Sequence, residues 1–542
     1  MKNIEIPLKN EKTLHYRLFE ILPGALTWTV LTAPFWLSMI SARVTALLII
    51  AFFLVWFTRA LAMNIRVLQG YSAMKKSEKY DWPLMLQELE NLPDTLEGQH
   101  IVPKWHQANI ERTRSLENRL KPSDLIHAVI IATYNESRET LEPTIKAVLD
   151  SHIDHKNTVL VIAFEERGGI EVERQAKELI KDYQNHFMHA FACKHPDGLP
   201  HEVRGKGGNI TFAGRELASW VEQKGIDPLN VVVTTLDSDN RPHPNYLPAL
   251  SYTYCLTPDP MYKSFQPIPI FTNNIWDAPA PMRVIATGNS FWMVIQALRP
   301  HILRNFAAHA QSLAALIKTD FWSTRTIVED GHQFWRTYFR FDGKHEVYPI
   351  FLPIYQDAVL STTYRKTLVA QFVQLRRWAW GASDIAYVAD KAFFQKNSIK
   401  FGDKMAKFLR LLEGHLSWAT APLILLFAAF IPLIFNPQDY TANQLPIIAS
   451  YIQRFAMLGI VITLFLSIKS LPPKPARYKK RRSLWMLLQW VYLPITGIFY
   501  SASAAIYSQT RLMLGKYLDK FDVTEKAVKT DAGTVGGHQV TK

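Results

Sequence analysis

The feature that most constrains the fold of this chain is a set of long apolar stretches at its two ends. Near the N-terminus, Leu22–Ile40 and Val44–Met63 are joined by the short connection Ser41–Arg43. A helix needs about 20 apolar residues to cross a bilayer, so these stretches predict a transmembrane hairpin. Leu416–Phe435 and Pro446–Ile468 predict a second hairpin on the same argument.

A last apolar stretch, Leu484–Thr510, is uncharged but contains Pro494 and several small or polar residues. A single span and helices lying in the membrane interface both remain open for it. Basic residues gather beside the apolar stretches, most densely in Lys474–Arg482, and such residues mark the cytoplasmic side of membrane proteins. We therefore expect a multi-pass protein of the cytoplasmic (inner) membrane whose polar middle faces the cytoplasm.

The net charge of +14 at pH 7 raises nucleic acid as a partner, but the placement of the basic residues argues against it. They flank apolar stretches and do not interleave with aromatic residues, as a base-stacking platform would require. The expected partner is a lipid bilayer, and no nucleic acid. The chain has only two cysteines, Cys193 and Cys255, which excludes a disulfide framework and a cysteine-rich metal site.

The polar middle alternates short β-rich apolar runs with helical patterns. The runs are His127–Ala132, Thr158–Ala163, Asn230–Leu236 and Met282–Thr287. Such alternation is typical of an α/β domain with a mostly parallel sheet flanked by helices. The predicted segments are a cytoplasmic N-terminus (1–21), a transmembrane hairpin (22–63), a cytoplasmic helical linker (64–122), the α/β domain (123–345), interfacial helices (346–414), a second transmembrane hairpin (415–470), a basic loop with the last apolar stretch (471–510) and a C-terminal tail (511–542).

Two carboxylates two residues apart, Asp237 and Asp239, directly follow the third of these apolar runs. At the end of a strand, such a pair is suited to holding one hard cation against a diphosphate. A solvated turn is the alternative explanation of an Asp-x-Asp sequence.

Two further sequences fit a nucleotide site. Thr133–Glu136 ends the first run, where open α/β sheets bind ligands, and there Tyr134 can stack on a base while Glu136 accepts a hydrogen bond from it. A turn with a helix cap explains this sequence equally well. In Arg204–Asn209, the glycines and Lys206 suit a phosphate, although the spacing is not that of a nucleoside-triphosphatase loop.

The order of motifs along the chain resembles glycosyltransferase family 2, in particular its membrane-embedded branch of cellulose synthase-like and hyaluronan synthase-like enzymes. The motifs are Thr133–Glu136, Lys206 to Asn209, Asp237–Asp239, Glu329–Asp330 and Gln374–Trp378, and the resemblance covers roughly positions 120 to 385. It implies a GT-A fold, a nucleotide-sugar donor linked to UDP or GDP, inversion at the anomeric carbon, and Mg²⁺ or Mn²⁺ as cofactor.

The resemblance also implies roles for single residues. Tyr134 and Glu136 are expected beside the nucleobase, Lys206 near the phosphates, Asp237 near the ribose or donor sugar, and Asp239 on the metal ion. Asp330 is the expected general base next to Glu329, although Val328 stands where many relatives have threonine. Acids at a helix N-terminus are the alternative explanation of that pair.

The Gln374–Trp378 motif is expected beneath the active site. The resemblance places Arg376 and Arg377 near the diphosphate, and Gln374 and Trp378 on the acceptor side, where the tryptophan offers an apolar face to a sugar ring. An amphipathic helix in the membrane interface, with snorkelling arginines, is the alternative.

Three places are less close to the family pattern. Glu165 stands in the turn after the second run, where many relatives have aspartate, which leaves the nucleotide open. Gly288 and Asn289 resemble an acceptor-side turn, and an ordinary strand–helix loop explains them equally well. Phe521–Lys526 resembles a gating loop that covers the donor, with a charged tail as the alternative.

These residues together predict an inverting hexosyltransferase that uses a nucleotide sugar to extend a polysaccharide or to modify a lipid-linked acceptor. A single-transfer enzyme acting on a glycolipid or polyprenyl phosphate is the alternative within enzymes. The alternative from another class is a non-catalytic membrane scaffold of an exopolysaccharide export complex. Four or five helices make a narrow channel, so a homo-oligomer or an export partner stays open.

Overall fold

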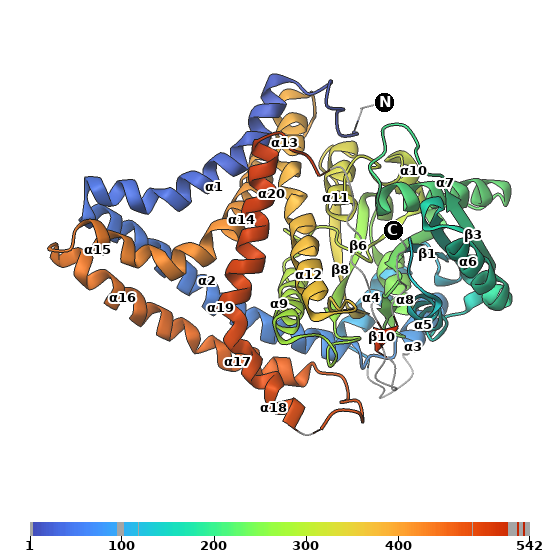
Figure 1. Ribbon diagram of the computed structural model, residues 1–542. Helices are drawn as coiled ribbons and strands as arrows, with labels where there is room; N and C mark the ends of the chain where they lie inside the picture. Colours follow the sequence, from blue (N-terminus) through green and yellow to red (C-terminus); the bar gives the residue numbers. More distant parts are fainter. Residues whose placement is uncertain are drawn as a thin grey trace.

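The computed structural model describes residues 4–94, 102–116, 119–479, 481–518, 528–529 and 535–536. A domain built on a mixed sheet lies on one side, and a set of long helices extends away from it on the other (Figure 1). The strands of the sheet are β1 (Ile126–Thr133), β2 (Thr158–Glu165), β3 (His189–His195), β4 (Val231–Asp237), β5 (Arg241–Pro242), β6 (Lys263–Phe271), β7 (Ala310–Ser312) and β8 (Glu346–Gln356), and β9 (Val528–Lys529) pairs separately with β10 (Val535–Gly536).

The strand order in the sheet is β3-β2-β1-β4-β7-β6-β8-β5. The first four strands are parallel neighbours, and their register aligns Ala132 of β1 with Ala163 of β2 and with Asp237 of β4. The carboxyl ends of β1, β2 and β4 therefore meet at one edge of the sheet. This is the edge at which open α/β sheets bind their ligands.

Helices cover both faces of this parallel half. Within β1, Val129 and Ile131 pack into a core with α5, α6 and α8, whereas Ala128 and Ile130 pack into a second core with α7 and α10. Successive side chains of a strand point to opposite faces, so a continuous apolar run fits a strand covered on both sides. The domain helices are α3 (Trp82–Asn91), α4 (Lys104–Arg114), α5 (Arg138–Leu149), α6 (Ile170–Tyr183), α7 (Lys206–Gln223), α8 (Tyr246–Leu256), α9 (Ala280–Ala297), α10 (Leu313–Lys318), α11 (Glu329–Arg340), α12 (Tyr364–Ala379) and α13 (Asp384–Ala389).

Two details of the sequence prediction are wrong. The run Met282–Thr287 is not a strand but part of helix α9, whose apolar residues pack against α2 and α17. A short apolar run does not by itself distinguish a buried strand from a buried helix. The sheet also extends past the boundary predicted at residue 345, because β8 pairs with β6 and β5.

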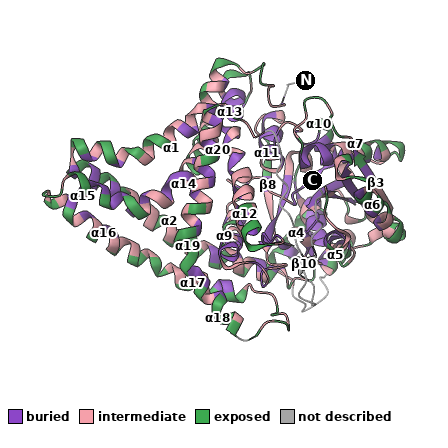
Figure 2. Ribbon diagram, viewed as in Figure 1, coloured by how far each residue is buried: buried purple, intermediate pink, exposed green. Residues whose placement is uncertain are grey.

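The long helices are apolar along most of their length. Five helical segments of the described residues are long and apolar enough to cross a membrane: Leu14–Ile40, Ala42–Ser77, Phe401–Phe435, Tyr440–Lys469 and Arg481–Met513. Much of their surface is not covered by protein (Figure 2). The predicted class, a mostly parallel sheet flanked by helices and joined to apolar helices, is confirmed. These segments comprise α1 (Leu14–Ile40), α2 (Ala42–Ser77), α14 (Phe401–Phe427), α15 (Ile431–Phe435), α16 (Tyr440–Met457), α17 (Gly459–Lys469), α18 (Arg481–Leu488), α19 (Leu493–Thr496) and α20 (Ser503–Met513).

The last of the five segments runs between the long helices and the sheet domain (Figure 1). Near its start, Arg482 donates to the carbonyl of Trp276 in the domain. At its end, Arg17 of α1 donates to the carbonyl oxygens of Leu512 and Met513. Before this end, Ser508 of α20 donates to the carbonyl oxygen of Arg376 on α12 of the domain. Contact with the domain near the start and along α20 favours interfacial helices over a single span.

Candidate active site

The ammonium group of Lys206 stands at the centre of a buried charge cluster at the carboxyl edge of the sheet. Its Nζ lies 2.9 Å from Oδ1 of Asp237, the last residue of β4. It lies 3.3 Å from Oδ2 of Asp330, which sits in the first turn of α11. The structure therefore brings together three residues that the sequence places far apart.

Two contacts hold Lys206 in place at the start of α7. Asn209 donates from its amide nitrogen to the carbonyl oxygens of Thr133 and Ala163, and so ties α7 to the ends of β1 and β2. A Cβ atom at Gly207 would lie 2.4 Å from the carbonyl oxygen of Ser323, closer than real Cβ contacts come. The glycine after Lys206 is therefore required by the close approach of the loop that precedes α11.

The cluster holds more negative than positive groups around the lysine. Burial alone would lower the pKa of Lys206, but the charges of Asp237, Asp330 and Glu329 raise it well above its ordinary value. Burial and the neighbouring charge of Asp330 raise the pKa of Glu329 to about 8. Glu329 thus holds its proton to a higher pH than an ordinary glutamate does, and Lys206 stays charged.

A buried histidine that the sequence did not reveal completes the surroundings of Asp330. Nδ1 of His309 donates to the carbonyl oxygen of Phe306 at 2.9 Å, because a carbonyl oxygen can only accept, and it lies 3.7 Å from Oδ1 of Asp330. Burial lowers the pKa of His309, so the ring is neutral beside the carboxylate.

Asp239 lies on the same edge and is oriented by two neighbouring loops. Its Oδ2 accepts from the backbone amide of Asp357, after β8, at 3.1 Å. Its carbonyl oxygen accepts from the side chain of Asn273, after β6, at 2.9 Å. The sequence analysis did not predict Asp357. An acidic residue directly after a strand would have pointed to it, but the strand β8 was not recognised.

The described residues contain no group of three or more His, Cys, Asp or Glu side chains arranged to hold a metal ion. Proteins commonly bind Mg²⁺ through one or two carboxylates while substrate phosphates and water fill the other positions. Asp239, beside Asp237 on a polar edge, fits a cation shared with a substrate in this way. It does not fit a cage made by protein alone.

The residues expected at the nucleobase form a second group at the ends of β1 and β2. The guanidinium carbon of Arg167 lies 4.2 Å from the ring centroid of Tyr134, and Arg167 is ion-paired with Glu165. Oε2 of Glu136 accepts from the hydroxyl of Thr133 and the backbone amide of Tyr134. Glu136 therefore caps the turn, and Tyr134 presents a ring already stacked on a cation.

The residues of α12 point in different directions. The charge of Arg377 acts on Glu329, which places this arginine near the carboxylate cluster. The guanidinium of Arg376 lies instead over Tyr507 of α20, at 5.7 Å from the ring centroid.

The outer residues of the motif make local contacts. The ring of Trp378 packs at 6.2 Å from that of Phe271, at the end of β6. Gln374 accepts from Gln371 one turn earlier in the same helix, at 3.1 Å. Helix α12 thus lies between the site and the long helices (Figure 1).

Two of the sequence assignments are not supported by this geometry or fall outside it. Gly288 and Asn289 lie inside helix α9 rather than in a turn after a strand, so the reason for placing them on the acceptor side is lost. The gating-loop motif Phe521–Lys526 lies outside the described residues.

Comparisons with known proteins add little to the site itself. No model of a protein family matches the chain, and no curated protein sequence matches it. A mannosyltransferase from Pyrobaculum calidifontis, solved in complex with GDP-Man and Mn²⁺, aligns with 84% of this chain and 100% of its own at 12% identity and a TM-score of 0.39. TarS 1–349 from S. aureus, in complex with UDP-GlcNAc, aligns with 76% of this chain and 97% of its own at 10% identity and a TM-score of 0.37. Likeness this distant leaves the activity to be argued from the residues of the site.

Proposed function

We propose that this protein is a membrane-bound inverting glycosyltransferase of the GT-A type. It transfers a hexosyl unit from a nucleotide sugar to a growing polysaccharide or a lipid-linked acceptor. The observation that carries the proposal is the meeting of Lys206, Asp237 and Asp330 at the carboxyl edge of a parallel sheet, beside Asp239. A structural role alone does not require this concentration of charge at a ligand-binding edge.

The reaction needs two kinds of help, and the cluster contains groups suited to both. An acceptor hydroxyl is a weak nucleophile, and Asp330 is the carboxylate that takes its proton. The oxygen then attacks the anomeric carbon as the bond from that carbon to the diphosphate breaks, which inverts the configuration. The nucleoside diphosphate leaves with the bonding electrons, and Lys206 faces its negative charge.

A divalent cation, Mg²⁺ or Mn²⁺, belongs to the same proposal. Asp239 is the residue that would hold it, with Asp237 beside it. Such an ion supplies charge neutralisation on the leaving diphosphate without a proton transfer. The chain's own contribution is to orient Asp239 through the amide of Asp357 and the side chain of Asn273.

The nucleobase and acceptor sides are assigned by position. Tyr134, Glu136 and Glu165 line the ends of β1 and β2, where the base would lie. On α12, we assign Trp378 and Gln374 to the acceptor and Arg377 to the diphosphate. The five apolar segments support an acceptor or product that belongs to the membrane or crosses it. We place the sheet domain in the cytoplasm, because basic residues flank these segments.

The test is to purify the protein in detergent and offer it a panel of UDP- and GDP-linked sugars with Mg²⁺ or Mn²⁺. Lipid extracts and oligosaccharides serve as acceptors. We expect metal-dependent release of nucleoside diphosphate that falls at least about 10²-fold in Asp330→Asn. The matched control is Asp259→Asn, in an exposed turn between α8 and β6.

The control variant should keep the wild-type rate. Folded wild-type protein that releases no nucleoside diphosphate with any donor would overturn the proposal. The alternative would then be a non-catalytic scaffold of an export complex.

A further inference from the structure

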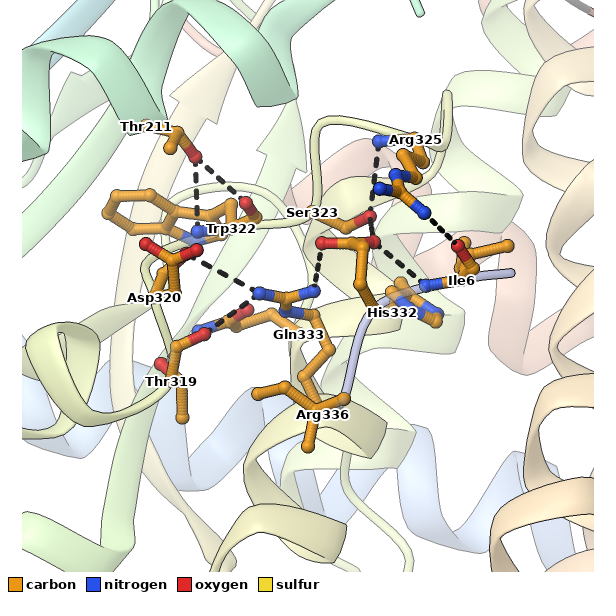
Figure 3. A network of polar contacts seen from close by, with 12 residues as sticks. Ile6, Thr211, Thr319, Asp320, Trp322, Ser323, Arg325, His332, Gln333 and Arg336 are labelled. Carbon is orange, nitrogen blue, oxygen red and sulfur yellow. Dashed lines mark hydrogen bonds and ion pairs between the residues drawn. The ribbon is translucent and has the colours of Figure 1, made fainter. Parts of the chain in front are cut away.

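Residues 4–6, which precede the first long helix, pack against helix α11 and the loop before it (Figure 3). We call this segment the N-terminal strap. Tyr387 of α13 donates its hydroxyl to the carbonyl oxygen of Ile4 at 2.7 Å. Arg325, in the loop before α11, donates to the carbonyl oxygen of Ile6 at 2.8 Å. The side chain of Ile4 is buried, so the strap is packed on the domain and not merely beside it.

The carboxylate of Glu5 bridges two parts of the domain at the centre of this contact. Its Oε2 accepts from Nη1 of Arg336 at 2.5 Å, and its Oε1 accepts from the hydroxyl of Ser323 at 2.5 Å. Burial by itself raises the pKa of Glu5, but the charge of Arg336 and the hydrogen bond from Ser323 outweigh it and lower that pKa. Glu5 is therefore a charged and partly buried group, with 23% of its side chain exposed.

Arg336 depends on this carboxylate. Its residue is 1% exposed, and Nη2 donates to the carbonyl oxygen of Thr319 at 2.8 Å. Among the described residues, Glu5 is the acid within ion-pair distance of its guanidinium. Removing one partner of a buried ion pair leaves the other charge uncompensated, which is strongly unfavourable.

Both partners of Glu5 belong to segments that carry active-site residues. Arg336 lies on α11, less than two turns after Asp330. Ser323 is the residue whose carbonyl oxygen packs on Gly207, next to Lys206. The strap therefore contacts both α11, which carries Asp330, and the loop before it, which packs on the residue next to Lys206.

The strap is also continuous with α1. At the start of that helix, His15 lies 2.9 Å from Asp390, directly after α13, and the helix packs on α13 and α14. A movement of α1 relative to the sheet domain would therefore displace Glu5.

We propose that Glu5 is a positioning residue that holds α11 and the loop before it so that Asp330 and Lys206 keep their separation. Through Glu5, the geometry of the active site depends on how α1 is seated against the domain. The expected effect on kcat rests on the proposed function. The expected loosening of α11 does not depend on it. A small displacement of a reacting group can cost about 10²-fold in rate.

The experiment compares Glu5→Gln, Glu5→Asp and the control Glu178→Gln on α6, whose side chain is 44% exposed and forms a surface ion pair with Arg174. For Glu5→Gln we expect kcat to fall about 10- to 100-fold, while the KM for the donor changes less than about threefold, because Glu5 contacts no ligand. Glu5→Asp keeps the charge and should recover most of the rate. The control should behave as wild type.

Hydrogen exchange provides a readout that does not require activity. In Glu5→Gln, the amides of α11 and of the loop 319–325 should exchange faster than in wild type, while those of β1 and β2 should not. Unchanged exchange in α11, or a wild-type kcat in Glu5→Gln, overturns the inference. A wild type inactive with every donor would instead count against the proposed function, and the exchange result would still decide the role of Glu5. If Glu5→Gln does not fold, Ser323→Ala, which removes one hydrogen-bond donor to Glu5, carries both measurements.

Discussion

Helix α11 carries a buried charge cluster on each of two sides, and the two differ in how they are balanced. Around Lys206, the carboxyl groups of Asp237, Glu329 and Asp330 act on one ammonium. On the strap side, Arg336 is matched by Glu5 and by backbone carbonyl groups. In both clusters the cation is more buried than its acid: Lys206 is 9% and Asp237 35% exposed, whereas Arg336 is 1% and Glu5 23% exposed.

The two clusters therefore differ in charge balance: three carboxyl groups surround one ammonium in the first, whereas one carboxylate faces one guanidinium in the second. In the cluster around Lys206, the excess of acid is relieved by a proton on Glu329, and a bound cation would relieve it further. In the strap cluster, the carboxylate of Glu5 balances the charge of Arg336, although Nε of Arg336 is buried without a hydrogen-bond partner among the described residues. The expected role of this pair is to hold geometry. The predictions below ask whether the first cluster acts on the rate alone, and whether the second also acts on the stability of the fold.

The largest effect is expected for Lys206→Met, which removes the cation that faces the leaving diphosphate. We expect kcat/KM to fall about 10²- to 10³-fold, the usual result of deleting a group that stabilises developing charge. Lys194→Met is the matched control, because Lys194 is 43% exposed and pairs only with surface acids among the described residues. A decrease of less than tenfold, with the protein folded, would contradict the role of Lys206.

Arg336→Met should lower stability and, because it breaks the same ion pair as Glu5→Gln, should also lower kcat. It leaves Glu5 without its cation. Breaking a fully buried pair costs about 3–5 kcal/mol, and the cost here should be lower because the Glu5 side chain is 23% exposed. The thermal midpoint in detergent, followed by tryptophan fluorescence, should fall by several degrees. Arg340→Met, at the more exposed end of the same helix, should shift it far less. Equal shifts in the two variants would contradict a stabilising role for the ion pair between Glu5 and Arg336.

Asp239→Asn should act on the metal requirement. Removal of divalent cations with a chelator should abolish activity, and Mn²⁺ or Mg²⁺ should restore it. In the variant, the concentration of Mn²⁺ needed for half-maximal rate should rise at least about tenfold, because a neutral amide binds a hard cation more weakly. An unchanged metal titration would move the proposed ligand away from Asp239.

The smallest effect concerns pH. Glu329 has a pKa raised from 4.5 to about 8 in the folded protein, so the folded state holds a proton that the unfolded state releases. The stability from this group is fully present below about pH 4.5 and is lost as pH rises to about 8. The variant Glu329→Gln has no carboxyl group at this position, so its stability lacks this dependence on pH. The midpoint of the wild type should therefore fall relative to that of the variant between pH 5.5 and 8.5, and parallel curves would contradict the raised pKa.

Local pattern was enough for part of the fold. The strands β1, β2 and β4 were predicted within about two residues, because each is a continuous apolar run bounded by polar residues. The strand β6 was missed, since Pro267 and Pro269 argue against a strand by propensity. Helix α9 was mistaken in part for a strand, because its middle is buried on most sides by α2 and the sheet.

The candidate site was predictable residue by residue but not as a geometry. Lys206, Asp237 and Asp330 were each expected from short motifs. In the structure, Nζ of Lys206 lies 2.9 Å from Oδ1 of Asp237 and 3.3 Å from Oδ2 of Asp330. His309 and Glu5 had no signal, because neither belongs to a motif and each acts through a partner distant in the chain. Their roles depend on packing between segments, which a local pattern does not describe.

By itself, the sequence determined the apolar segments, the parallel strands and the kinds of chemical group available. These follow from interactions between neighbours in the chain, from the alternation of side chains in a strand, and from the thickness of a bilayer. Only the tertiary structure decided that the last apolar segment lies between the long helices and the domain, and that Glu5 reaches Arg336. Those contacts join residues hundreds of positions apart, so they depend on how whole elements pack and not on the order of residues within any one of them.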